Sequence, residues 1–242
     1  MSYDSAYYER GFGGRMAGAF SRFSTHIMAR HLTGGEKGGR LLEVGFGRGA
    51  LLKEVRALGW EVSGVEVSKY AVDNAREAGL EAHLGDLLDA NLEDNSFDVV
   101  VFRHVLEHIE KPLRAVEEAH RILKPGGRLV IRVPNIDSIE SRLAGQDWFH
   151  LDVIYHLHNF TPASLSLLLG QAGFCCVKVS HFPLEYRQVM AYSLVSRLRP
   201  GDPRKSRSSL ALAAFAMPAS IALSYLCSLL GRGGTIEATA RK

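Results

Sequence analysis

Short apolar runs alternate with amphipathic stretches from residue 40 onward. The runs RLLEV, EVSGVEV, LEAHLG and FDVVVF are typical of strands, whereas ALLKEVRAL and KYAVDNAREA are typical of helices that end at Gly59 and Gly79. This alternation predicts a parallel sheet with helices on both faces. Because ligands bind such sheets at the carboxyl ends of the strands, we expect the functional residues there.

Helical spacing also marks the segments on either side of this core. Apolar residues recur on one face between Arg15 and His31, which predicts an amphipathic helix before the first strand. Thr161 followed by Pro162 is a helix start and Gly173 is a helix stop, so SLSLLLGQA is expected to be a helix that leads into the strand FCCVKVS.

Composition indicates an ordinary globular enzyme of one domain. The 242 residues are 46% hydrophobic and 23% charged, and a formal net charge of +3 is too small to predict a nucleic-acid partner. Three cysteines and an N-terminus without an apolar run favour reduced thiols and a cytoplasmic location.

The stretch LLEVGFGRG, residues 41–49, combines a buried strand with a glycine turn before a helix. Glycines at 45, 47 and 49 let a ligand approach the main chain, which is typical of nucleotide binding. With Ala50 and the later Glu66, the turn also satisfies the dinucleotide fingerprint, so an NAD-binding oxidoreductase stays an alternative on this motif alone.

Four further landmarks accompany the turn in order. They are Glu43 inside the first strand, Glu66 ending the second, the Gly-Asp pair at Asp86, and the block FDVVVFRHVLEHI followed by LKPGGRLVIRVPN. Together they resemble the class I S-adenosylmethionine (SAM) dependent methyltransferases, in particular the type 11/23 group, over residues 41–174. The nicotinamide alternative does not account for Glu43, Asp86 or the PGG turn.

This resemblance implies a role for each matching residue. Glu66 would accept both ribose hydroxyls, Asp86 would accept from the adenine amine, and Leu87 would cover the ring, whereas helix capping or solvation is the alternative for both acids. The main chain of the turn would line the methionine portion, and Glu43 would orient that turn. The implied cofactor-binding set is Glu43, Gly45, Phe46, Gly47, Gly49, Glu66, Val67, Asp86, Leu87, Phe102 and Arg103.

The sequence HVLEH, residues 104–108, has a rival interpretation. H-x-x-E-H is also a zinc metalloprotease signature, with two histidines four residues apart. The strand before it and the PGG turn after it favour the methyltransferase, so we predict no metal and give Glu107 and His108 a structural role. A metal cluster of His150, His156 and His158 has no support from the family and is also not predicted.

The segment from Trp148 to His158 resembles a family loop, although the family usually has prolines where Val153 and Ile154 stand. Methyl transfer needs a nucleophile close to the sulfonium and a way to lose its proton. His156 is the first candidate for the base and His104 the second. The alternative is that these histidines only brace the loop by hydrogen bonds.

The C-terminal part contains a basic stretch, residues 197–209, followed by an uncharged run from Leu210 to Leu230 that is about long enough to span a bilayer. The final TIEATARK resembles the family's closing antiparallel strand, which must join the same sheet. Pro218 near the middle of the run therefore favours two short helices that turn back, at a membrane interface or over the substrate pocket. A buried hairpin or a dimer contact is the alternative.

We therefore predict an α/β fold: a Rossmann-like, doubly wound, seven-stranded sheet whose last strand is antiparallel. The expected divisions are a cap segment (1–39), a SAM-binding core (40–183), an apolar helical insertion or lid (184–233) and a closing strand (234–242). The expected activity is SAM-dependent methylation, with O-methylation preferred, of a small or lipid-linked acceptor at the inner face of the membrane. The alternative from another class is a non-catalytic SAM-binding partner protein.

Overall fold

The computed structural model describes residues 15–36, 38–152, 155–182, 189–198 and 206–242. Its centre is one seven-stranded sheet of order β3-β2-β1-β4-β5-β7-β6. The first five strands run parallel, and β7 is antiparallel to both β5 and β6, which confirms the predicted fold class. The strands are β1 Arg40–Val44, β2 Glu61–Glu66, β3 Glu81–Leu84, β4 Phe97–Arg103, β5 Leu123–Pro134, β6 Cys175–His181 and β7 Thr235–Arg241.

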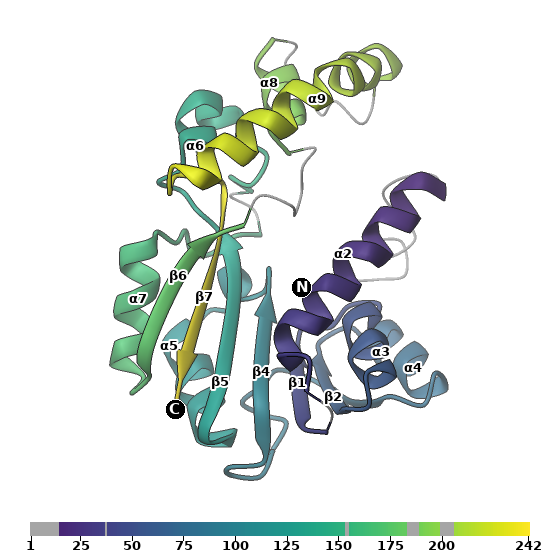
Figure 1. The fold of residues 1–242 in the computed structure, drawn as a ribbon, viewed down its shortest axis with the longest axis vertical. Helices are drawn as coiled ribbons and strands as arrows, with labels where there is room; N and C mark the ends of the chain where they lie inside the picture. Colours follow the sequence, from purple (N-terminus) through teal and green to yellow (C-terminus); the bar gives the residue numbers. More distant parts are fainter. Residues whose placement is uncertain (1–14, 37, 153–154, 183–188, 199–205) are drawn as a thin grey trace.

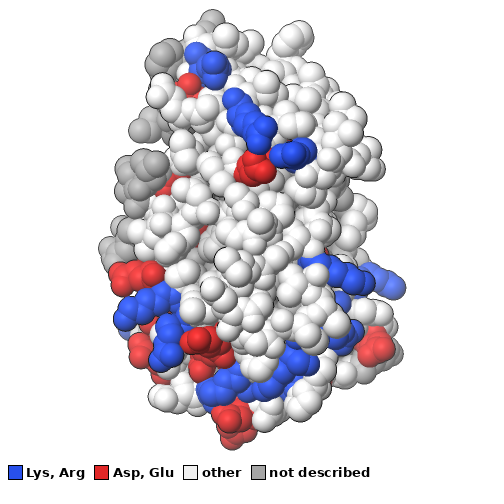
Figure 2. Space-filling model, turned by 90° about the vertical axis from the view of Figure 1, so that its left-hand side faces the viewer, with Lys and Arg blue, Asp and Glu red and all other residues white. Residues whose placement is uncertain are grey.

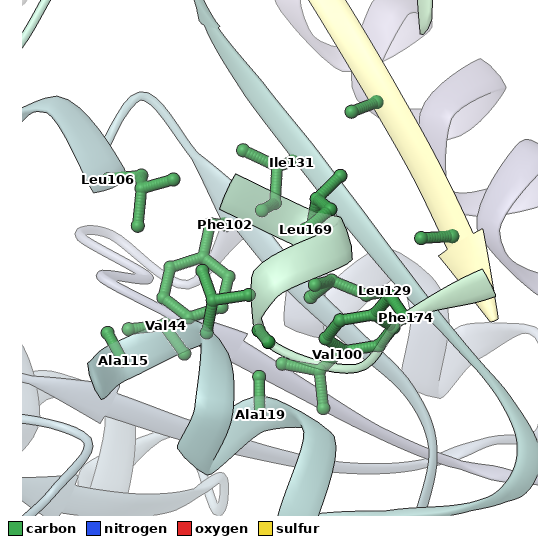
Figure 3. Packing of buried hydrophobic residues seen from close by; sticks show 14 of the residues in the cluster. Val44, Val100, Phe102, Leu106, Ala115, Ala119, Leu129, Ile131, Leu169 and Phe174 are labelled. Atoms are coloured by element: carbon green, nitrogen blue, oxygen red, sulfur yellow. The ribbon is translucent and has the colours of Figure 1, made fainter. Parts of the chain in front are cut away.

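Successive residues of the central strands supply two separate cores. Leu42 and Val44 belong to one core, together with residues of α5 (Pro112–Ile122) and α7 (Pro162–Gln171). Figure 3 shows Val44, Ala115 of α5 and Leu169 of α7 in this core. Leu41 faces the other layer and packs with residues of α2 (Arg15–Thr33), α3 (Ala50–Ala57) and α4 (Lys69–Glu77). Burial on both faces explains why these strands are almost continuously apolar.

Two helices begin at residues whose side chains cap the first turn, and one of these starts was predicted from the sequence. Thr161 begins α7 with a capping box in which its side chain accepts from the Ser164 N–H, and Pro162 occupies the first turn. Ser68 caps α4 in the same way through the Ala71 N–H. These local signals fix where each helix leaves the sheet edge.

Three helices lie beyond the carboxyl ends of the parallel strands (Figure 1). They are α6 (Ile139–Ala144), α8 (Val189–Leu198) and α9 (Arg207–Leu229), and α9 packs on both of the others. The prediction of two short helices around Pro218 was wrong, because α9 continues through this proline. A proline inside a helix removes one hydrogen bond, and the packing on α6 and α8 is sufficient to keep the helix continuous.

Among the described residues one helix, Ser208–Leu229, is long and apolar enough to cross a membrane, and only 22% of its most apolar window is buried. Figure 2 shows one side of the molecule, on which charged side chains are dense over the lower half and sparse over the upper half. The helices at the carboxyl end of the sheet belong to this upper half (Figure 1).

Candidate active site

The glycine turn between β1 and α3 is held by β2. The Gly45 N–H donates to the Val65 carbonyl at 2.7 Å, and the Gly47 N–H donates to Glu66 Oε2 at 2.9 Å. Gly45, Gly47 and Gly49 have φ angles of 68°, 54° and 66°, in the left-handed region that favours glycine. The turn therefore follows an unusual path that its neighbours fix before any ligand binds.

Gly45 is needed for a second reason. A Cβ at this position would lie 2.4 Å from Cγ2 of Val105, the residue between β4 and the short 3₁₀ helix η1 (Leu106–His108). The glycine turn is thus in direct contact with the H-x-x-E-H segment. No sequence signal pointed to Val105, because its importance comes only from this contact.

The two acids that end neighbouring strands lie side by side. Glu66 is buried, with Oε1 accepting from the Ser68 N–H at 3.0 Å and Oε2 accepting from Gly47. The Gly85 N–H donates to the Glu66 carbonyl at 3.0 Å, which places the exposed Asp86 next to it. Each carboxylate oxygen accepts up to two hydrogen bonds, so Glu66 keeps acceptor capacity for a ligand.

Asp86 and Val67 face outward at this edge. Asp86 Oδ1 accepts from the Asp89 N–H at 3.0 Å, and Val67 is 53% exposed directly after β2. Glu43 lies deeper, 1% exposed, with Oε1 3.5 Å from a guanidinium nitrogen of Arg103 at the end of the adjacent strand β4. The two strand ends are therefore joined across the sheet by opposite charges.

Three residues of the expected cofactor set are core residues. Phe102 is fully buried, and Leu87 belongs to the same apolar cluster beneath α5 and α7. Phe46 is also buried and packs on β2, where a Cβ at Gly64 would lie 2.3 Å from its ring. In this conformation their side chains fill the core, so their main chain is the part available at the sheet edge.

A cluster of histidines stands beside the turn, at the carboxyl end of β4. His104 has a φ of 54° and its N–H donates to the Arg132 carbonyl, and its ring stacks on that of His150 with centroids 6.1 Å apart. His104 Nδ1 lies 3.6 Å from Glu107 Oε1. A non-glycine residue held in the left-handed region is a form of backbone strain found at functional sites.

His156 joins this cluster from the loop after α6. Its Nδ1 donates to the His150 carbonyl at 2.8 Å, and its ring meets that of His108 edge-on at 4.8 Å. Burial lowers the pKa of His156, although the Glu107 carboxylate acts in the opposite direction. The imidazole is thereby favoured in its neutral form.

The loop is attached to η1 by its main chain. The N–H groups of Leu157 and His158 donate to the Glu107 carbonyl at 2.8 and 3.1 Å, and His108 Nδ1 donates to the Tyr155 carbonyl at 2.9 Å. One potential ligand atom each from Glu107, His108 and His156 lies within 4.8 Å of the others. The sequence placed Glu107 and His108 in one motif and singled out His156 separately, but it gave no signal that the three side chains meet.

Some residues considered from the sequence lie outside the described part of the chain. These are Val153, Ile154 and, in the basic stretch, Arg199, Arg204 and Lys205. Arg197, the first residue of that stretch, is described, and its guanidinium donates to the carbonyls of Leu143 and Ala144 in α6.

Sequence relatives share the core of the chain. A protein of Methanocaldococcus jannaschii without an assigned function is 32% identical over 59% of this chain and 67% of its own length. A ubiquinone biosynthesis O-methyltransferase of Alkalilimnicola ehrlichii is 34% identical over 42% of this chain and 44% of its own length. The chain thus spans less than half of the length of that methyltransferase.

Solved structures share the fold over nearly the whole chain. A SAM-dependent methyltransferase from Archaeoglobus fulgidus superposes with a TM-score of 0.65 at 20% identity, covering 100% of both chains. A SAM-dependent methyltransferase from Thermotoga maritima, described as a possible histamine N-methyltransferase, gives 0.63 at 22% identity, covering 98% of this chain and 95% of its own. The family model described as "Methyltransferase domain" matches residues 14–179, so the chain belongs to the methyltransferase-domain family, whose methyl donor is SAM, and has the fold of its class I members.

Proposed function

We propose that this protein transfers a methyl group from SAM to an oxygen atom of a small or lipid-linked acceptor. The observation that carries the proposal is the contact of Glu66 with the Gly47 N–H, because it places a buried carboxylate and a glycine turn at adjacent strand ends. SAM supplies a methyl group on a sulfonium and presents a ribose diol, an adenine amine and an amino-acid end to the protein.

The residues at the strand ends fit these groups. Glu66 would accept from the ribose hydroxyls with the acceptor capacity that its two main-chain partners leave. Asp86 would accept from the adenine amine, and Val67 offers exposed apolar surface between them. The main chain of Gly45, Phe46, Gly47 and Gly49 would line the amino-acid end, with Glu43 and Arg103 holding the neighbouring strand ends together.

Proton removal from an acceptor hydroxyl is assigned to the histidine cluster, first to His156 and second to His104. A general base must be neutral to accept a proton, and burial favours the neutral form of His156. Several relatives are named as O-methyltransferases, which favours oxygen over nitrogen as the methylated atom.

Helix α9 supports an amphiphilic or lipid-linked acceptor, because large apolar side chains are exposed along its outward face. The outward face is uncharged and carries Phe215, Leu226 and Leu229, which are 86%, 52% and 70% exposed. The inward side packs on Tyr192 and Val195 of α8 through Leu212, Ala213 and Met217 and also buries several small or polar residues. Ser209, Ala213, Ser220, Ser224 and Cys227 are all buried. A soluble helix normally buries its apolar stripe, so this face is suited to an apolar environment beside the site.

The experiment that tests the function is calorimetric titration with S-adenosylhomocysteine, the product of SAM. We expect binding by the intact protein and at least 10-fold weaker binding by Glu66→Ala, since a hydrogen bond to a charged group contributes about 1.5–3 kcal/mol. Glu61→Ala, at the exposed opposite end of β2, is the matched control and should bind normally.

The outcomes separate the rival functions. No binding of S-adenosylhomocysteine together with binding of NADH would contradict the proposal in favour of an oxidoreductase. Binding without methyl transfer to any acceptor, in the presence or absence of vesicles, would indicate a non-catalytic partner protein. Turnover of polar free metabolites alone, with no effect of detergent or vesicles, would contradict the lipid-linked acceptor.

A further inference from the structure

We propose that Glu107, His108 and His156 form a binding site for one divalent transition-metal ion. Two imidazoles and one carboxylate are a donor set that binds zinc and related metals with three protein ligands and leaves a position open. The three side chains come from η1 and from the loop after α6, and one potential ligand atom of each lies within 4.8 Å of the others.

Both histidines keep one ring nitrogen for a metal ion. His108 Nδ1 lies 2.9 Å from the Tyr155 carbonyl, and His156 Nδ1 lies 2.8 Å from the His150 carbonyl. A carbonyl only accepts, so each Nδ1 carries the proton and each Nε2 carries a lone pair. A hydrogen bond from the second ring nitrogen to a main-chain carbonyl is the usual outer support of a metal-bound histidine.

The third donor is a buried carboxylate that needs positive charge. Glu107 is 1% exposed, and among the described residues neither of its carboxylate oxygens accepts a hydrogen bond. His104 Nδ1 lies 3.6 Å from Glu107 Oε1, beyond hydrogen-bond distance. A buried carboxylate is costly unless it is paired or binds a metal, so a divalent ion would satisfy this group.

The spacing allows an ion to be bound with a small adjustment. Two donors bound at about 2.1 Å in a tetrahedral site stand about 3.4 Å apart. Donor atoms now within 4.8 Å would therefore have to approach by up to about 1.4 Å. The main-chain hydrogen bonds from Leu157 and His158 to the Glu107 carbonyl keep the loop and η1 together, so the contraction requires only side-chain and local loop movement.

The open position gives the metal a role in the proposed reaction, and this part of the inference rests on the proposed function. An acceptor hydroxyl bound to the metal would have a lower pKa and would release its proton to solvent. Its oxygen would then form the new bond to the methyl carbon while the bond from that carbon to the sulfonium sulfur breaks. His156 would act as a ligand in this case, and it would affect the acceptor proton through the metal.

The metal site is tested on tag-free protein dialysed against a chelator. Cobalt(II) added to it should give visible absorption bands that saturate at one equivalent, and calorimetry with Zn²⁺ should give the same ratio. Glu107→Gln, His108→Gln and His156→Gln should each weaken binding at least 10-fold. His158→Gln is the matched control, because His158 is a half-buried histidine of the same loop that lies outside the proposed donor set and whose Nε2 is 3.4 Å from the Glu110 carbonyl.

The variants are first compared by thermal melting and by binding of S-adenosylhomocysteine. Absence of cobalt binding by the intact protein, or equal binding by His156→Gln and the intact protein, would overturn the metal site. If S-adenosylhomocysteine still binds in that case, the proposed function stands without the metal. If cobalt binds but S-adenosylhomocysteine does not, the metal site stands and the proposed function fails.

Discussion

His31 Nε2 lies 2.9 Å from Glu237 Oε1, which joins the N-terminal helix α2 to the closing strand β7. The other oxygen of Glu237 lies 2.6 Å from Nε of the buried Arg132 on β5. Arg132 also stacks over the ring of Phe182, which follows β6. One carboxylate thus connects the first helix with the three strands on the antiparallel side of the sheet.

Replacing this carboxylate should destabilise the fold. Removing one member of a buried ion pair costs about 3–5 kcal/mol, so we expect Glu237→Gln to lower the free energy of unfolding by about 3 kcal/mol at pH 7. Urea unfolding followed by circular dichroism measures this difference. The double variant Arg132→Met with Glu237→Met is the control, and it should recover part of the loss because it removes both charges.

The same pair predicts a dependence on pH. Burial raises the pKa of Glu237, but the hydrogen bond with His31 and the charge of Arg132 outweigh it and hold the pKa below its usual value of 4.5. The contribution is therefore complete above pH 4.5 and is lost as the pH falls through the folded-state pKa. The difference between the intact protein and Glu237→Gln should shrink only below pH 4.5, and an equal difference at every pH would contradict this assignment.

The pKa of Glu140 is raised, whereas that of Glu237 is lowered, so we expect a substitution of Glu140 that removes the charge to stabilise the protein. Burial raises the pKa of this α6 carboxyl, although hydrogen bonds from Ser224 and the Gly234 N–H partly offset the rise. Its folded-state pKa lies above the unfolded value, so stability falls as the pH rises from 4.5 through the folded-state pKa. Glu140→Gln keeps an acceptor without the charge and should raise the melting temperature at pH 7–8, with no gain below pH 4.5. Glu140→Ala removes the acceptor and should lower the melting temperature at both pH values.

The sequence predicted correctly the features that depend on residues close together in the chain. The glycines of the turn directly follow β1 and the acid Glu66 ends β2, so the pairing of these two strands brings them to one edge of the sheet. The path of α9 was mispredicted because Pro218 is a helix breaker only in the absence of packing, and the sequence does not show that α6 and α8 support the helix. The meeting of His156 with Glu107 could not be predicted either, because it depends on main-chain hydrogen bonds between a loop and η1.

Gly45→Ala tests the contact between the glycine turn and Val105. The substitution combines a left-handed φ of 68° with a Cβ only 2.4 Å from Val105 Cγ2. We expect the turn to shift and S-adenosylhomocysteine to bind at least 10-fold more weakly, because left-handed strain alone costs about 1–2 kcal/mol. Gly126→Ala is the matched control: its φ is 76° but no atom lies within 4 Å of the new Cβ. It should lose some stability while keeping its affinity, and equal affinity losses in both variants would indicate a general effect on the fold.

The exposed face of α9 predicts reversible binding to lipid vesicles. Phe215, Leu226 and Leu229 point outward on one uncharged side of the helix, so each would gain about 1 kcal/mol by partial transfer into the interface. Replacing all three by serine should therefore reduce vesicle binding in a flotation assay by roughly 100-fold. Leu167→Ser is the matched control. This leucine is also strongly exposed, at 64%, but it lies on α7, which packs on the sheet and is not part of the α9 face. The contradicting outcome is an intact protein that stays in the soluble fraction and is a dimer by light scattering, with a triple variant that is a monomer. The α9 face would then be an interface between two copies of the chain, and lipid binding would be excluded as its role.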